Sequence, residues 1–286
     1  MFQNQASVNR RRTELTVIAV LIVGVIVYAG VGLAVSASRV ANAERTLNVV
    51  VSHQNTLTST FNDINTQLSQ LSSGSAFNPQ QSIILVDKSV SNSETATKTI
   101  EADDGSLASA ASQLGATRWL VVVGQNSLDR EATRIQHARN ALGAARTIAS
   151  DELQDGHFWH SLYAGIYDLT RLEAQTYAND LTSAQTTLGM FKADIDSALA
   201  LSTAPGLPTE LHDMMADMQT FIADYGKQLS AQVAGDDASV AAYQGTVNAD
   251  RQKLGTYDFD KIGAAITAYY KPLIDRFNSE IAAATS

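Results

Sequence analysis

Residues Leu15 to Ala37 form an unbroken stretch without a charged side chain. As an α-helix this stretch reaches about 34 Å, enough to cross a hydrocarbon core of about 30 Å. Three arginines, Arg10 to Arg12, precede it, whereas only Arg39 follows closely. Because positively charged flanks stay in the cytoplasm, this asymmetry predicts a cytoplasmic N-terminus at 1–14, a transmembrane signal-anchor helix at 15–37 and an extracytoplasmic remainder. The chain is thus expected in the cell membrane as a single-pass protein, held in the lipid bilayer through this helix.

A cleaved signal peptide is the main alternative to a retained anchor. Ala41-Asn42-Ala43 fits an A-x-A cleavage site, and the arginines suit the positive region of a signal peptide. The apolar run exceeds the usual length of about 7–15 residues, however, and the helical pattern continues through the cleavage site. A pilin-like N-terminal helix is a third alternative because Glu14 precedes an apolar run, but no glycine cleavage site precedes Glu14 at the right place. A retained anchor is therefore favoured.

Cysteine content and charge exclude several classes of function. The chain has no cysteine, which excludes disulfides, thiolate metal sites, cysteine nucleophiles and a lipid-modified cysteine anchor. The net charge is −9, and residues 1–14 contribute three Arg and one Glu, so the remainder carries −11. An acidic surface of this kind is unsuited to nucleic acid and is repelled by anionic lipid headgroups.

Apolar residues after the anchor follow helical spacing. From Val40 a seven-residue repeat predicts a helix over 39–73 that continues the anchor, and its mostly neutral flanking positions favour coiled-coil-like packing against helices of the same chain. A second stripe predicts a long helix over 157–203; its members are Tyr177, Leu181, Ala184, Leu188, Phe191, Ile195 and Ala198. The pattern predicts an all-α fold.

The two long stripes also suggest an internal duplication. A shift of about 130 residues places Phe61 on Phe191, and a slightly larger shift places Asp103-Asp104 on Asp236-Asp237. Each copy would form a four-helix bundle, one over 38–150 and one over 151–286, joined through the long helix. The expected helices are 39–73, 80–101, 104–123, 127–150, 157–203, 209–234, 236–254 and 258–284.

Polar clusters give few candidates for chemistry. The aspartate pairs Asp103-Asp104 and Asp236-Asp237 are expected to cap helix N-termini. Asp155, His157 and His160 bring carboxylate and imidazole together, and two histidines three apart can share a helix face and a metal ion. Ordinary exposed side chains between two bundles explain these residues as well, and no HExxH motif is present.

Two further clusters have ordinary explanations beside functional ones. Met214, Met215 and Met218 fit core packing, with a hydrophobic ligand pocket or copper binding as the alternatives. Tyr269-Tyr270-Lys271-Pro272 could line a pocket at a bend caused by Pro272, although exposed tyrosine is commoner. Motifs for phosphate binding and for nucleophilic serine are absent from the sequence. We therefore assign no catalytic, cofactor-binding or metal-ligating residue.

The sequence favours a structural or protein-interaction role for an extracytoplasmic helical bundle, with a protein partner or self-association. Small residues at Gly30/Ala34 and Gly32/Ser36 would let another membrane helix approach the anchor, although glycine is common in such helices. The alternative is small-molecule sensing through a membrane partner, because the architecture resembles the exported helical domains of bacterial chemoreceptors and sensor kinases. The chain departs from that pattern in having one span and a short cytoplasmic end. An enzyme built on Asp155, His157 and His160 is least favoured.

Overall fold

The computed structural model describes residues 43–46, 49, 78–115 and 125–285. Every regular element in these residues is an α-helix, which confirms the predicted all-α class. None of the helices in these ranges has both the length and the apolar character needed to cross a bilayer. The predicted anchor at 15–37 lies outside the described residues, as does most of the predicted helix 39–73.

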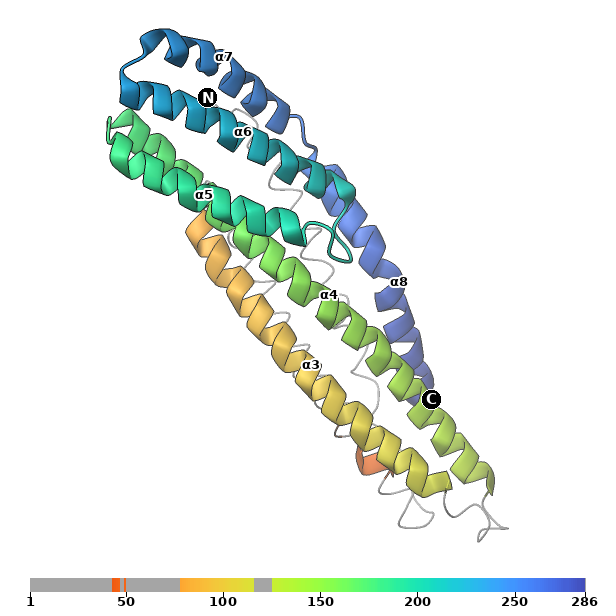
Figure 1. Ribbon diagram of the computed structural model, residues 1–286. Helices are drawn as coiled ribbons and strands as arrows, with labels where there is room; N and C mark the ends of the chain where they lie inside the picture. Colours follow the sequence, from red (N-terminus) through yellow and green to blue (C-terminus); the bar gives the residue numbers. More distant parts are fainter. Residues whose placement is uncertain (1–42, 47–48, 50–77, 116–124, 286) are drawn as a thin grey trace. The chain divides into compact units, whose positions relative to one another are not determined.

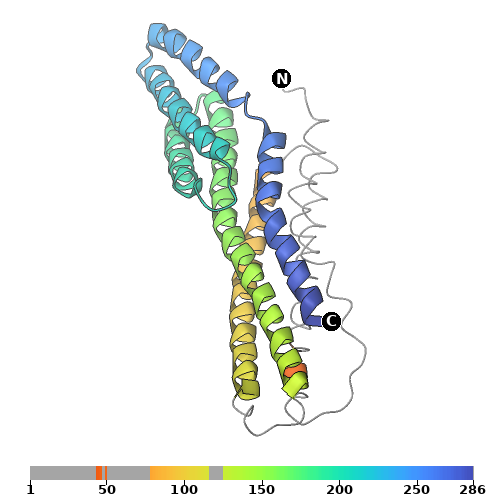
Figure 2. The same cartoon turned by 90° about the vertical axis from the view of Figure 1, so that its right-hand side faces the viewer.

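Six labelled helices make up most of the described chain, and residues 43–46 and 49 are helical as well (Figures 1 and 2). They are α3 (Pro79–Gly115), α4 (Gln125–Tyr177), α5 (Leu181–Leu201), α6 (Thr209–Ala234), α7 (Asp237–Leu254) and α8 (Phe259–Thr285). The bounds of α6 match the predicted helix 209–234, and those of α7 and α8 lie within one residue of the predictions.

The described residues group into two compact units. Unit 1 contains 78–90 and 153–266, and unit 2 contains 43–46, 49, 91–115, 125–152 and 267–285. Helices α3, α4 and α8 therefore each contribute residues to both units. Each unit draws on residues from both sides of position 150, and the predicted duplication of 38–150 in 151–286 stays a hypothesis from sequence.

Helix α3 is one helix where two were predicted. Its first turn begins at Pro79, a residue suited to that position, and the side chain of Asn78 accepts a hydrogen bond from the Gln81 backbone N–H at 3.3 Å. The predicted break before 104 is wrong because Asp103 occupies an inward position on the helical stripe. The buried members of that stripe are Ser82, Leu85, Ser93, Ala96, Ile100, Asp103, Leu107 and Leu114. Asp103 therefore lies in mid-helix and caps no N-terminus.

Helix α4 corrects two further predictions. It continues through 151–156, where a junction between bundles was expected, because that segment keeps the inward spacing with Asp151, Asp155 and Phe158 buried. It then ends at Tyr177, so the predicted single helix over 157–203 is wrong. The chain reverses at Asn179, whose φ of 57° is left-handed, and the Asp180 carboxylate accepts the Ser183 backbone N–H at 3.2 Å to start α5.

Within unit 1, α6 lies between α5 and α7 (Figure 1). The inward faces of α5 and α6 meet through aromatic rings: Phe191 and Phe221 lie edge to face with centroids 6.3 Å apart, and both are fully buried. Tyr225 continues this face and donates its hydroxyl to Thr176 of α4 at 3.0 Å. The core of unit 1 thus lies on one side of α6.

Within unit 2, α4 contacts both α3 and α8. Arg139 of α4 donates to Asp104 of α3 at 2.8 Å, and Arg134 donates to the Ala284 carbonyl of α8 at 2.8 Å. On the inward face of α8 after Ile266, Tyr270 and Ile274 are buried, whereas Tyr269 is exposed and Leu273 half-buried. Ile266, Tyr270 and Ile274 are spaced four residues apart, close to the 3.6 residues of one helical turn, so they lie on the same face of α8 and point toward the core.

Candidate interaction surface

Unit 1 has an open groove of about 710 Å³ on the outer side of α6, which we term the α6 groove. Its floor is formed by α6, one wall by α5 and the other by α7. The α5 wall has Gln185 and Leu188, and the α7 wall has Ser239 and Tyr243. The floor runs from Ala223 to Ala234, about 16 Å or three helical turns.

Small side chains on the outer face of α6 create the depth of the groove. Ala223, Gly226, Ser230 and Ala234 recur at three- and four-residue steps and therefore share one face of the helix. A Cβ at Gly226 would lie 3.3 Å from Leu188 Cδ2, which shows how closely the α5 wall approaches the floor. The inward side of α6 carries the large residues, so the two faces differ in size as well as in polarity.

The α7 wall is held by few apolar contacts. Val247 is the buried residue of this 18-residue helix. Polar contacts do much of the holding: Arg251 donates to Glu173 of α4 at 2.7 Å, and Lys253 donates to Asp217 of α6 at 2.7 Å. Gln244 accepts from Gln228 at 2.9 Å. Helix α7 is thus attached to its neighbours with little apolar burial of its own.

One end of the groove is closed by the turn from α6 to α7. Gly235 adopts φ 69° at the C-terminus of α6, a left-handed conformation that glycine adopts without strain. The Asp236 carboxylate accepts the Ser239 hydroxyl at 2.6 Å and the Ser239 backbone N–H at 3.1 Å, and these two bonds lower the pKa of Asp236. The predicted capping role of Asp236-Asp237 is thereby confirmed for Asp236, with Asp237 in the first turn.

The net negative charge of the protein is concentrated in this part of the chain. Residues 153–266 contain fifteen Asp and Glu against six Lys and Arg, whereas the rest of the sequence contains fourteen of each. Lys227 is a cation on the groove floor, and its ammonium pairs with Asp224 at 2.6 Å, which raises the pKa of Lys227. Exposed Asp236 and Asp237 stand at the closed end. The lining of the groove, with Lys227 and Asp236, therefore has little net charge, whereas residues 153–266 as a whole are acidic.

Crowding of carboxylates also affects α4 and α5 in unit 1. Burial and the nearby Asp168 carboxylate raise the pKa of Asp194, although His160 opposes this rise. Burial raises the pKa of Asp168 itself against the opposing effect of Arg171. Two residues along, the Lys192 and Gln219 side chains donate to Asp196 and lower its pKa. Neighbouring aspartates of α5 thus have opposite electrostatic environments.

The predicted metal candidates do not come together. His160 Nδ1 lies 2.6 Å from the Asp87 carboxylate of α3, His157 is exposed and Asp155 is buried. Across the ranges that the structure describes, no group of three or more His, Asp or Glu side chains is arranged to hold a metal ion. The least favoured hypothesis, an enzyme or metal site on these residues, thus gains no support from their geometry.

The remaining candidates have structural positions. Met214 and Met215 are buried and Met218 is half-buried, consistent with core packing. Tyr269 donates its hydroxyl to Asp151 at 3.0 Å and stacks edge to face on the buried Tyr270. Lys271 pairs with Asp275 at 2.6 Å, and Pro272 lies inside α8.

Two contacts made by histidine side chains were not predicted from the sequence. His137 Nδ1 lies 2.7 Å from Glu280, and His212 Nδ1 lies 2.8 Å from the Ser202 hydroxyl. The Ser202 hydroxyl, at the C-terminal end of α5, also donates to the Leu199 carbonyl at 2.7 Å. Only Ser202 and His212 lie close in sequence, and nothing in their spacing marked them.

Comparisons of the chain with protein-family models, with curated proteins and with solved structures found no match. The class of the protein is therefore defined by its own fold and surface. It is an all-α protein with an acidic helical unit that carries an open groove.

Proposed function

We propose that the protein is a single-pass membrane protein whose helical domain faces outside the cytoplasm and works by binding another protein. The uncharged stretch at 15–37 and the arginines before it support the anchor and its orientation. A bundle with a distinct acidic unit supports the interaction role. In this proposal the helical domain that follows the anchor presents the binding surface, and the protein catalyses no reaction.

The observation that carries the proposal is the α6 groove. A surface trough about three turns long, floored by small side chains, has the form in which one helix receives another. A small-molecule site of similar volume would normally enclose most of its ligand. The groove is open along its length, so it fits a partner with an extended surface better than a small ligand.

Sensing of a small molecule is the second candidate, and the groove volume of about 710 Å³ is the observation that favours it. The two candidates differ in what stabilises the protein. A small ligand present at about 100 times its dissociation constant should add about 2.7 kcal/mol to the free energy of unfolding. A thermal scan of the full-length protein against organic acids and amino acids tests this directly.

The interaction role is tested in native membranes. Photo-crosslinking side chains placed at exposed positions of α5, α6 and α7 should trap a specific protein, and protease added to intact cells should digest the helical domain. If no position yields a discrete crosslinked species while an amino acid or organic acid shifts the unfolding temperature, the sensing role replaces the interaction role. If the domain resists external protease in intact cells, the proposed orientation is wrong.

A further inference from the structure

We infer that the α6 groove receives a basic amphipathic helix of a partner protein. The inference rests on the proposed interaction role and names its surface and the chemistry of its partner. Three observations support it: the size of the floor residues, the chemistry of the two walls and the charge of residues 153–266.

The floor allows close approach of a helix. Ala223, Ser230 and Ala234 are exposed, Gly226 is half-buried, and none of these four has a long side chain. The long side chain of Lys227, which also lines the groove, pairs with Asp224 of the same helix. Interaxial distances between packed helices fall toward about 8 Å when the contact residues are small. A helix of about 11 or 12 residues matches the length from Ala223 to Ala234.

The walls provide apolar contacts along that length. Leu188 of α5 and Tyr243 of α7 are half-buried and line opposite sides of the groove. A partner helix with apolar residues at steps of three and four would contact the floor and both walls.

Charge decides between the occupants. Residues 153–266 have fifteen acidic against six basic side chains, and the floor lysine, Lys227, is paired with Asp224. A second copy of the chain that presented its own residues 153–266 would bring the same negative charge to the groove and be repelled, as would an anionic lipid surface. A helix with lysine or arginine on its outer face would be attracted by the acidic unit while its apolar face fills the trough.

The test uses the full-length protein in a non-ionic detergent and two labelled peptides of about 14 residues. Both peptides have leucine and alanine on one helical face; one has lysine on the other face, and the second has glutamate. Binding is followed by fluorescence anisotropy. Two protein variants are compared with the wild type: Ser230→Trp, which fills the groove floor, and Ala241→Trp, at an exposed position of α7 that does not line the groove.

The lysine peptide should bind the wild type and weaken with added salt, and Ser230→Trp should reduce its affinity by about tenfold or more. Ala241→Trp should leave the affinity within about twofold, and both variants should retain the circular dichroism of the wild type. Equal binding to the wild type and Ser230→Trp, no binding at all, or equal binding of the glutamate peptide would overturn the inference. If Ser230→Trp loses its helical signal, Ala223→Trp replaces it at the same floor.

Failure here is distinguishable from failure of the proposed function. If crosslinking in native membranes traps a partner but the lysine peptide does not bind at the groove, the interaction role stands and the groove assignment fails. If the peptide binds the groove as expected but no partner is trapped in membranes, the groove assignment stands and the interaction role fails.

Discussion

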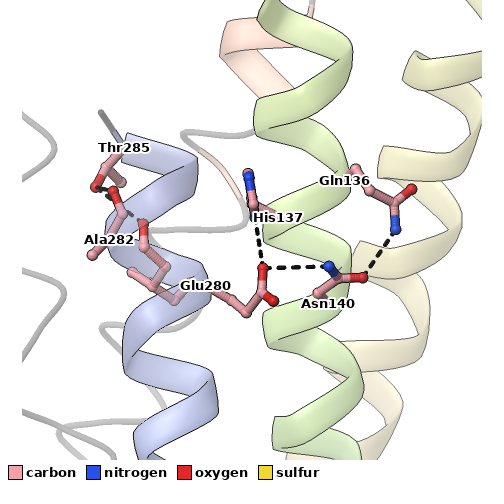
Figure 3. A network of polar contacts seen from close by, with 7 residues as sticks. Gln136, His137, Asn140, Glu280, Ala282 and Thr285 are labelled. Atoms are coloured by element: carbon pink, nitrogen blue, oxygen red, sulfur yellow. Dashed lines mark hydrogen bonds and ion pairs between the residues drawn. The ribbon is translucent and has the colours of Figure 1, made fainter.

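His137 Nδ1 of α4 lies 2.7 Å from Glu280 Oε2 of α8, although 143 positions separate the two residues in the chain (Figure 3). Asn140, one turn further along α4, donates to the same glutamate oxygen at 3.3 Å. The hydrogen bond from His137, followed by that from Asn140, holds the pKa of Glu280 below its ordinary value. This carboxylate therefore joins α4 to α8 within unit 2.

The stability of unit 2 should depend on pH through Glu280. Because the folded protein lowers the pKa of this group, its contribution is present above the ordinary glutamate pKa of 4.5 and is lost as the pH falls through the lowered value. Glu280→Gln should reduce the free energy of unfolding by about 0.5–1 kcal/mol near neutral pH and by progressively less in acid. Urea unfolding of the full-length protein over a pH series measures this difference.

Asp275→Asn on the same helix is the matched control for Glu280→Gln. Asp275 pairs with Lys271 one turn away, and both side chains are at least 60% exposed. This variant should change stability less than Glu280→Gln does at every pH. Equal effects of the two variants, or an effect of Glu280→Gln that persists in acid, would show that the contact to His137 contributes nothing.

Two aspartates of α5 should respond oppositely to loss of charge. Asp194 has a raised pKa from burial and from Asp168, so its ionised form is disfavoured in the fold at neutral pH. Asp194→Asn should therefore raise the unfolding temperature by roughly 1–3 °C. Asp196 has a lowered pKa through Lys192 and Gln219, and Asp196→Asn should lower the unfolding temperature. Differential scanning calorimetry of both variants decides the matter, and shifts of the same sign would contradict it.

Two glycines of α4 should also respond oppositely to alanine. A Cβ at Gly156 would meet Val90 Cγ2 of α3 at a distance that forces a stiff β-branched side chain to move. Gly156→Ala should lower the free energy of unfolding by about 1–3 kcal/mol. Gly143 is exposed with nothing near its Cβ position, so Gly143→Ala should raise it by about 0.5–1 kcal/mol. Chemical denaturation that shows Gly156→Ala to be neutral or stabilising would refute the close approach to α3.

Backbone amides of α7 should exchange with solvent faster than those of α6. Val247 is the buried residue of α7, whereas α6 buries nine. Because the contacts of Arg251 to Glu173 and Lys253 to Asp217 are ionic, added salt should speed exchange in α7 more than in α6. Hydrogen exchange with mass spectrometry measures both helices in one experiment. Equal protection of α6 and α7 at low and high salt would contradict the weak attachment of α7.

The sequence predicted some helices well because their ends carry strong local signals. Helix α6 begins after Pro208 and ends before Gly235. Proline restricts its own backbone angle φ, and glycine readily adopts the left-handed conformation that ends a helix. Both effects are local and need no tertiary contact. The Asp236 cap was predicted for the same reason. Local chemistry settles such boundaries.

Other features depend on tertiary contacts and were mispredicted. The chain reverses at Asn179, but Tyr177 and Leu181 on either side of the turn are four residues apart, as in a helix. The spacing of apolar residues therefore predicted one continuous helix where the chain forms two. Asp103 resembled the capping Asp236 in sequence, but the stripe of α3 buries it in mid-helix. The α6 groove needs three helices, and its floor of small residues resembles any exposed helix face in the sequence.

Helix α4 has 53 residues without a break, and it belongs to unit 2 up to residue 152 and to unit 1 from residue 153. Helices α3 and α8 likewise each contribute residues to both units. No single cut of the polypeptide can therefore release either unit intact, since unit 1 combines 78–90 with 153–266 and unit 2 combines segments before, between and after these two. A truncation at position 150, the boundary between the two bundles predicted from the sequence, would cut the continuous helix α4 and leave both units incomplete.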